Sequence, residues 1–321
     1  MYTSIVVPLD GSAFANRALP IALILASRSD AAVTLVNVAE RGTLADGLPT
    51  QDARLSEDLQ RENQSALGEL AARLTDEAAL RVDAEFLEGP VVSTLQRYLA
   101  GRCHDLVVMM THGRRGLSRA WFGSVADGLV RNATIPLLLM RDAAERTGDP
   151  VEPLFHRVLV PLDGSPLAEE VLDHVVSLGT PDVTVFVLLT IVVPSHALDF
   201  PDSVPLSDHG GDGAWREAAV VYLAGVAAEL RESGALVEVC VEMHAQPAQA
   251  ILDAAARQHA DLIALSTHGR GAMSRIGHGS VADEVVRGAA VPTFVYRPER
   301  AGHGFTEGEH GADTVAAARK R

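Results

Sequence analysis

The sequence predicts an α/β protein made of two tandem, doubly wound sheets, each with five parallel strands. Short apolar runs alternate with helical patterns along the chain, and the whole arrangement occurs twice. The apolar runs are almost continuous, which is typical of parallel strands that helices cover on both faces. A length of 321 residues also suits two domains better than one.

Two motifs reveal the duplication. SIVVPLDGS at 4–12 returns as RVLVPLDGS at 157–165, which is 153 residues later. THGR at 111–114 returns at 267–270, which is 156 residues later. Because the two offsets differ by only three residues, the copies are nearly equal in length, and a duplicated unit of about 140 to 150 residues explains both motifs.

The repeat predicts where the domains begin and end. We expect a first domain at 1–141, a linker at 142–155 and a second domain at 156–297. The remaining segment, 298–321, is rich in glycine, histidine and charged residues, so we expect it to be disordered.

The elements follow from the patterns of each copy in turn. In the first copy, strands are expected at 4–10, 32–39, 80–87, 105–110 and 135–140, and helices at 12–28, 51–79, 90–102 and 123–133. In the second copy, strands are expected at 157–163, 182–191, 236–242, 261–266 and 291–296, and helices near 165–178, 214–233, 247–259 and 279–289. The last strand of each copy is apolar and lies at a sheet edge, so we expect 135–140 and 291–296 to pack against each other within the chain.

Composition excludes several classes of function. With 42 acidic and 27 basic residues the formal charge is -15, which disfavours binding to nucleic acid. No signal-peptide pattern and no membrane-length apolar run is found, and Cys103 and Cys240 lie in unlike contexts, so we expect a cytoplasmic protein without a structural disulfide. The sole lysine is Lys320, which excludes a P-loop lysine, and neither GxxxxGK[ST] nor GxGxxG occurs.

Candidate site residues follow the strands, because open parallel sheets bind ligands at the carboxyl ends of their strands. Asp10-Gly11-Ser12 and Asp163-Gly164-Ser165 follow the first strand of each copy. One interpretation is a ligand contact by the aspartate. The other is a turn in which Asp or Ser caps the next helix, and the local sequence favours this second interpretation.

The segments after the fourth strands combine glycine, arginine and a helix start. The first copy offers Gly113, Arg114 and the pair Gly123-Ser124, and the second offers Gly269, Arg270 and the pair Gly279-Ser280. Unpaired N–H groups at a helix start suit an anion such as phosphate, and arginine reinforces the preference. The alternative is a solvent-exposed loop followed by a capped helix.

Taken together, VPLDGS, THGR and the glycine-serine pairs resemble the universal stress protein family, and two such units resemble its tandem members. The resemblance covers nearly all of 1–297. It implies a Rossmann-like sheet, similar to that of the adenine nucleotide alpha hydrolases, with strand order 3-2-1-4-5. It also implies that the units pair through their last strands and that ATP binds, as it does in many members, to a loop of the form G-x2-G-x9-G-S/T.

The same resemblance assigns roles to residues of this chain. Asp10 and Asp163 would contact the adenosine part, and Val38 and Ile191 would meet adenine. The phosphate loops would supply Gly113, Gly123, Ser124, Gly269, Gly279 and Ser280, beside Arg114 and Arg270. The first glycine of the pattern is replaced by Met110 in one copy and by Ser266 in the other. Because methionine is much larger than serine, we expect the second copy to bind nucleotide more tightly.

The sequence therefore predicts a stress-response sensor or regulator that binds ATP or another adenine nucleotide, with or without Mg, and that can form a homodimer. A scaffold of the same fold with empty clefts is the alternative. A slow ATPase ranks third, because no general base and no metal-binding carboxylate pair is identifiable in the loops, and no metal site or catalytic residue is expected.

Overall fold

The structure, a computed structural model, describes residues 2–40, 51–101, 103–111, 123–132, 134–141, 154–194, 212–267 and 280–298. We call 2–141 the first half and 154–298 the second half. The predicted tail from residue 299 onward lies outside the described residues, as does most of the predicted linker. Its last two positions, Leu154 and Phe155, are described and are buried in the core.

The elements of the first half follow the predicted alternation of strands and helices. They are β1 (Ser4–Pro8), the 3₁₀ helix η1 (Ala15–Ala18), α1 (Leu19–Ser29), β2 (Ala32–Ala39), α2 (Gln51–Ala78), β3 (Val82–Glu88), α3 (Val91–Ala100), β4 (Leu106–Met110), α4 (Ser124–Asn132) and β5 (Leu137–Met140). The helix predicted at 12–28 is divided, because Pro20 favours a helix start at α1 and cannot continue a preceding helix.

The second half repeats this order. Its elements are β6 (Arg157–Pro161), α5 (Pro166–Glu169), α6 (Val171–Val175), the 3₁₀ helix η2 (Val176–Leu178), β7 (Val185–Val192), α7 (Asp212–Glu232), β8 (Leu236–Met243), α8 (Pro247–Arg257), β9 (Leu262–Ser266), α9 (Ser280–Gly288) and β10 (Thr293–Tyr296). The single helix predicted near 165–178 is three short segments instead.

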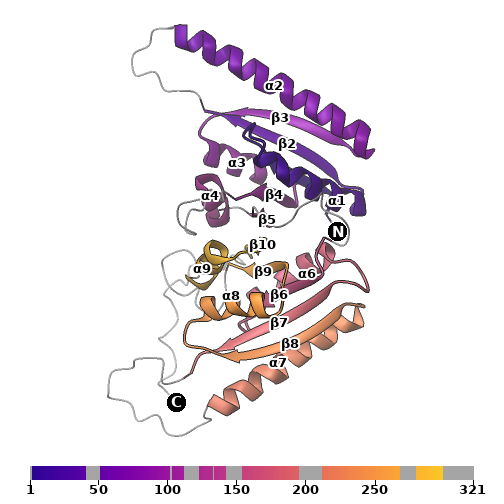
Figure 1. The fold of residues 1–321 in the computed structure, drawn as a ribbon, viewed down its shortest axis with the longest axis vertical. Coiled ribbons are helices and arrows are strands. Elements are labelled where there is room, and N and C mark those ends of the chain that lie inside the picture. Colours follow the sequence, from indigo (N-terminus) through magenta and orange to yellow (C-terminus); the bar gives the residue numbers. More distant parts are fainter. Residues whose placement is uncertain are drawn as a thin grey trace, which may run out of the picture.

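The ten strands form one continuous sheet with the order β3-β2-β1-β4-β5-β10-β9-β6-β7-β8 (Figure 1). Each half contributes the predicted order 3-2-1-4-5 with parallel pairing, which confirms the fold class. The prediction of two five-stranded sheets understates the result, because β5 and β10 pair antiparallel and join the halves into one sheet. In that register Leu138 lies opposite Phe294 and Leu139 opposite Thr293.

Helices cover both faces of the sheet and enclose two apolar clusters. The first cluster lies on the face that carries α1, α2, α6 and α7, and includes Leu25, Leu67, Val175 and Leu223. The second lies on the face that carries α3, α4, α8 and α9, and includes Leu95, Leu129, Ile251 and Val285. Each cluster contains residues of both halves, so the apolar core runs across the β5–β10 junction.

Polar contacts reinforce this junction. Arg141, directly after β5, donates through Nη2 to the carbonyls of Val286 and Arg287 near the end of α9. Burial lowers the pKa of the Arg141 guanidinium, while carbonyls at a helix C-terminus are favourable partners for a cation. At the end of α1, Arg28 donates to the carbonyl of Leu178 and to Oγ1 of Thr180, each at 2.9 Å.

The junction provides a stability prediction. Phe294 is fully buried, so Phe294→Ala should lower the free energy of unfolding by about 3 to 5 kcal/mol, because it removes apolar contacts and leaves a cavity. Val221→Ala is the control: its side chain on α7 is 68% exposed, and the change should stay within about 0.5 kcal/mol. Urea denaturation measures both. Equal, small losses for the two variants would contradict a packed junction.

Candidate functional site

The Asp-Gly-Ser turns have the same geometry in both halves. Gly11 and Gly164 each have φ +78°, a left-handed conformation that glycine adopts without strain. The backbone N–H of Ser12 donates to Oδ1 of Asp10, and that of Ser165 to Oδ1 of Asp163, both at 3.0 Å. Asp10 and Asp163 are exposed at the carboxyl edge of the sheet.

Serine, not aspartate, accepts a backbone hydrogen bond from the segment that follows each turn, and Ser165 is the N-cap of α5. Oγ of Ser165 accepts from the N–H of Ala168 at 3.2 Å, at the start of α5, and Oγ of Ser12 accepts from the N–H of Ala15 at 3.1 Å. The turn interpretation therefore applies to the serine, and the aspartate remains available for the ligand interpretation. Serine stabilises the chain that follows, while the aspartate carboxylate closes the turn and faces solvent.

Val38 and Ile191 lie near the ends of β2 and β7, the strands that pair with β1 and β6 respectively. Both side chains are half-buried and pack against the second apolar cluster. A side chain one residue earlier ties each strand to the turn, because Nδ2 of Asn37 donates to the carbonyl of Leu9 at 2.8 Å and Oγ1 of Thr190 donates to that of Leu162 at 3.0 Å. Neither hydrogen bond is predicted from the sequence, although a polar residue inside an apolar strand is a signal for one.

The phosphate-loop residues are described only in part. Gly123 directly precedes α4 and its carbonyl accepts from the N–H of Asp127 at 2.8 Å, so the helix begins at the predicted pair Gly123-Ser124. In the second half α9 begins at the predicted Ser280. The other predicted residues, Gly113, Arg114, Gly269, Arg270 and Gly279, lie outside the described residues.

Met110 occupies the face of the sheet opposite Val38. Its side chain is 9% exposed and packs in the first apolar cluster, together with Val108, Leu9 and Leu19, whereas Val38 packs against the second. Met110 therefore fills the core on the α1 side of β4. The larger volume of Met110 compared with Ser266 therefore does not reduce the space on the face of the sheet where Val38 lies.

An open cleft of about 570 Å³ lies beside the start of α4. The first turns of α3 and α4 contribute most of its lining, together with the residue that follows β2. The lining comprises Glu40, Pro90, Val91, Val92, Ser93, Gln96, Ser124, Val125 and Asn132. Ser124 is a predicted site residue. Glu40 places a carboxylate in the lining, and its Oε1 accepts from the N–H of Val91 at 3.4 Å.

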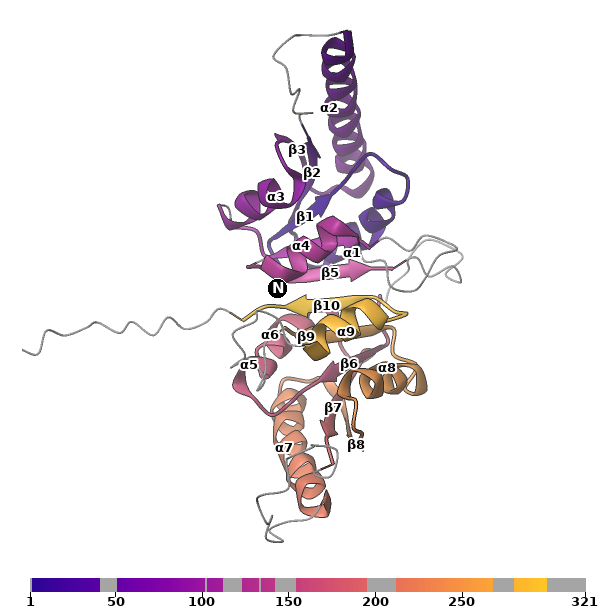
Figure 2. The same ribbon diagram turned by 90° about the vertical axis from the view of Figure 1, so that its left-hand side faces the viewer.

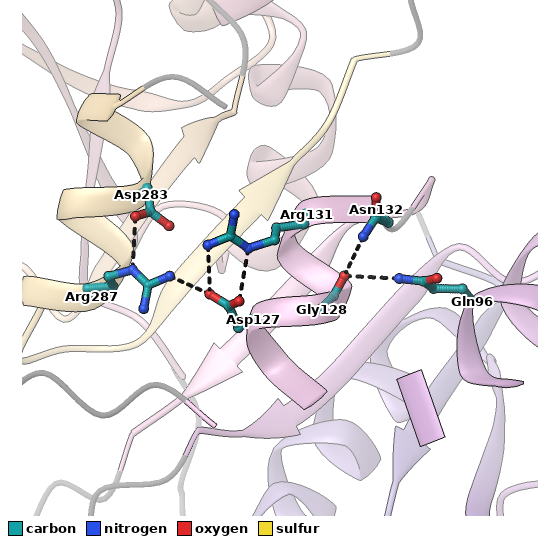
Figure 3. A network of polar contacts seen from close by, with 7 residues as sticks. All are labelled: Gln96, Asp127, Gly128, Arg131, Asn132, Asp283 and Arg287. Carbon is teal, nitrogen blue, oxygen red and sulfur yellow. Dashed lines mark hydrogen bonds and ion pairs between the residues drawn. The ribbon is translucent and has the colours of Figure 1, made fainter. Parts of the chain in front are cut away.

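A network of charged side chains joins α4 to α9 (Figure 3). Arg131 and Arg287 both bond Asp127, and Arg287 also donates through Nε to Asp283 at 2.9 Å. The hydrogen bond from Arg131 is the largest cause that holds the pKa of Asp127 below its usual value. The hydrogen bond to Asp283 contributes most to raising the pKa of Arg287.

In the part of the chain that the structure describes, no three or more His, Cys, Asp and Glu side chains group in a way that could hold a metal ion. None of the helices described is both long and apolar enough to cross a membrane.

Comparison with known proteins agrees with this architecture of two duplicated α/β units. The model of the Universal stress protein family matches residues 1–141 and again residues 154–297. The chain therefore belongs to the universal stress protein family and carries two such domains in tandem.

Individual relatives agree. A universal stress protein of Mycolicibacterium smegmatis is 28% identical over 304 residues, covering 92% of this chain and 97% of its own. The universal stress protein MJ0531 of Methanocaldococcus jannaschii is 32% identical over 143 residues, covering 44% of this chain and 83% of its own. The crystal structure of a universal stress protein from Archaeoglobus fulgidus has the same fold, with a TM-score of 0.63 at 21% identity over 92% of this chain and 96% of its own.

The charged network predicts a pH dependence. Because the pKa of Asp127 is lower in the folded chain than in the unfolded chain, its ion pairs stabilise the fold above the unfolded value of about 3.9 and are lost as the pH falls through the folded value. Asp127→Asn should therefore be less stable than the unmodified protein at neutral pH, and the difference should narrow as the pH falls below the unfolded value of the Asp127 pKa. Urea denaturation across this range measures the difference. A constant gap would contradict the assignment.

Proposed function

We propose that the chain binds ATP or a related adenine nucleotide at the carboxyl edge of each half-sheet and acts as a stress-response regulator. The observation that carries the proposal is the duplicated Asp-Gly-Ser turn, which has the same glycine φ and the same 3.0 Å bond in both halves and leaves each aspartate exposed. Membership of the universal stress protein family supports the proposal. The VPLDGS, THGR and glycine-serine motifs of this chain are the ones that, by resemblance to that family, imply nucleotide binding.

The residues present fit an adenine nucleotide. Asp10 and Asp163 would accept hydrogen bonds from the adenosine part, and the half-buried Val38 and Ile191 would offer apolar surface to adenine. The helix starts at Ser124 and Ser280 would offer N–H groups and a positive dipole end to phosphate, together with Gly113, Gly123, Gly269 and Gly279. Arg114 and Arg270 would add positive charge. Any Mg²⁺ would arrive with the nucleotide.

The direct test is to identify bound small molecules. Mass spectrometry of the supernatant after denaturing purified protein should detect an adenine nucleotide, and titration calorimetry of nucleotide-free protein should detect its binding. A preparation that carries no nucleotide and binds none would favour the interaction scaffold. That alternative has one observation in its favour, because α7 exposes Trp215 at 59% and Val221 at 68%.

Asp163→Ala separates ligand binding from stability. We expect it to weaken nucleotide binding about 10- to 100-fold, corresponding to the loss of a hydrogen bond to a charged group, with little change in the unfolding temperature of the nucleotide-free chain. Ser165→Ala is the matched comparison: it removes the Oγ that accepts from Ala168 and donates to Oδ1 of Asp163 at 2.6 Å, but it keeps the carboxylate, so it should cost about 1 kcal/mol of stability and weaken binding much less than Asp163→Ala does. If Asp163→Ala lowers only the stability, the aspartate serves the turn alone.

The two halves should bind with unequal affinity, the second more tightly. The carbonyl of Ala39, the last residue of β2, accepts from the N–H of Gly89. The carbonyl of Val192, the last residue of β7, accepts in the same way from the N–H of His244. The residues that follow, Glu40 and Val193, therefore occupy equivalent positions in the two halves. The first half thus carries a carboxylate where the second carries an apolar residue. Glu40→Gln should raise the first site's affinity several-fold by removing repulsion of phosphate. Calorimetry that finds two equal sites in the unmodified chain would contradict this expectation.

A further inference from the structure

A single guanidinium connects the first turns of two helices that belong to different halves. Nη2 of Arg287, in the last turn of α9, bonds Oδ1 of Asp127 in α4, and its Nε donates to Oδ2 of Asp283 at 2.9 Å. Figure 3 shows Arg287 between the two carboxylates, with Arg131 on the other side of Asp127. Asp127 and Arg287 are 160 residues apart in sequence.

Both carboxylates belong to the first turns of the helices whose starts would bind phosphate. Asp127 follows Ser124 by three residues, and Asp283 follows Ser280 by three. Side chains in a helix lean toward its N-terminus, so each carboxylate adds negative charge near the N–H groups that would receive phosphate. An unpaired carboxylate there would compete with an anion for the positive end of the helix dipole.

We propose that Arg287 of the second half sets the nucleotide affinity of the first half, by compensating the charge of Asp127 at the start of α4. The inference rests on the proposed function and adds a cross-half regulation to it. Arg131 compensates the same carboxylate from within the first half. The affinity of the first half therefore depends on a residue that the second half supplies across the β5–β10 junction.

The partial exposure of the Asp127 and Arg287 side chains limits how much Arg287 changes the nucleotide affinity. The side chains of Asp127 and Arg287 are 30% and 32% exposed, so water screens their interaction with a bound phosphate. Under such screening, loss of one positive charge should weaken binding of a polyphosphate by about three- to tenfold.

The experiment observes each half separately in the full chain. Isotope-labelled protein, freed of nucleotide, is titrated with ATP while NMR follows the backbone amides of Gly123 and Ser124 in the first half and of Ser280 in the second. The variants are Arg287→Gln, Arg287→Lys and the double variant Asp127→Asn with Arg287→Gln. Arg257→Gln is the matched control, because Arg257 is an exposed arginine of the second half that pairs with Glu242.

The expected results are specific to the pair. Arg287→Gln should weaken the ATP response of Gly123 and Ser124 about three- to tenfold, Arg287→Lys should retain most of the affinity, and the double variant should recover it. Arg257→Gln, which changes the net charge equally, should alter affinity less than about twofold. Urea denaturation confirms that each variant is folded at the titration temperature.

Contrary results distinguish failure of this inference from failure of the proposed function. An unchanged first-half affinity in Arg287→Gln, equal weakening by Arg257→Gln, or no recovery in the double variant would overturn this inference and leave the proposed function standing. If ATP at millimolar concentration shifts none of the three amides in the unmodified chain, the proposed function and this inference both fail.

Discussion

The antiparallel pairing of β5 with β10 is the contact on which the rest of the architecture depends. Both strands are short and almost wholly buried, with apolar side chains on both faces. Left unpaired, either would expose backbone donors and acceptors along an apolar edge. Their pairing turns two half-sheets into one sheet (Figure 2). The pairing lets each apolar cluster extend across the junction. It also brings α4 and α9 together, which allows Arg287 to reach Asp127.

The two halves share the scaffold of the proposed site and differ in the residues around it. The Asp-Gly-Ser turns retain one geometry, and Asn37 and Thr190 make equivalent bonds with different chemical groups. The differences lie around that scaffold. The second half has Val193 at the position equivalent to Glu40, and Ser266 at the position equivalent to Met110. Glu40 contributes to the lining of the cleft beside α4, whereas Met110 lies in the core on the other face. Near the proposed site, the two halves therefore differ more directly in charge, through Glu40, than in side-chain size, through Met110.

Local patterns predicted the strands well, because continuous apolar runs leave little doubt about residues buried on both faces. The strand order came from the family resemblance, since the sequence pattern fixes alternation and not spatial neighbours. The broken helix after β1 could have been anticipated from Pro20, which lies at the start of α1. Pro166 marks only the start of α5, and the two later breaks, before α6 and before η2, have no proline to signal them. The bond between Arg287 and Asp127 could not, because its partners meet only after both halves have folded and joined. The cap role of Ser165 was among the alternatives, and only geometry separated it from Asp163.

Joining β5 and β10 within one polypeptide has a thermodynamic consequence for assembly. Two half-length chains with the same edges would have to associate, and the extent of their pairing would depend on protein concentration. Here a covalent tether holds the edges together at an effective concentration on the order of millimolar, so the junction forms equally well in dilute and concentrated solution. Two unlike halves can therefore remain matched even when the protein is scarce, and a contact such as that between Asp127 and Arg287 can evolve with a fixed partner.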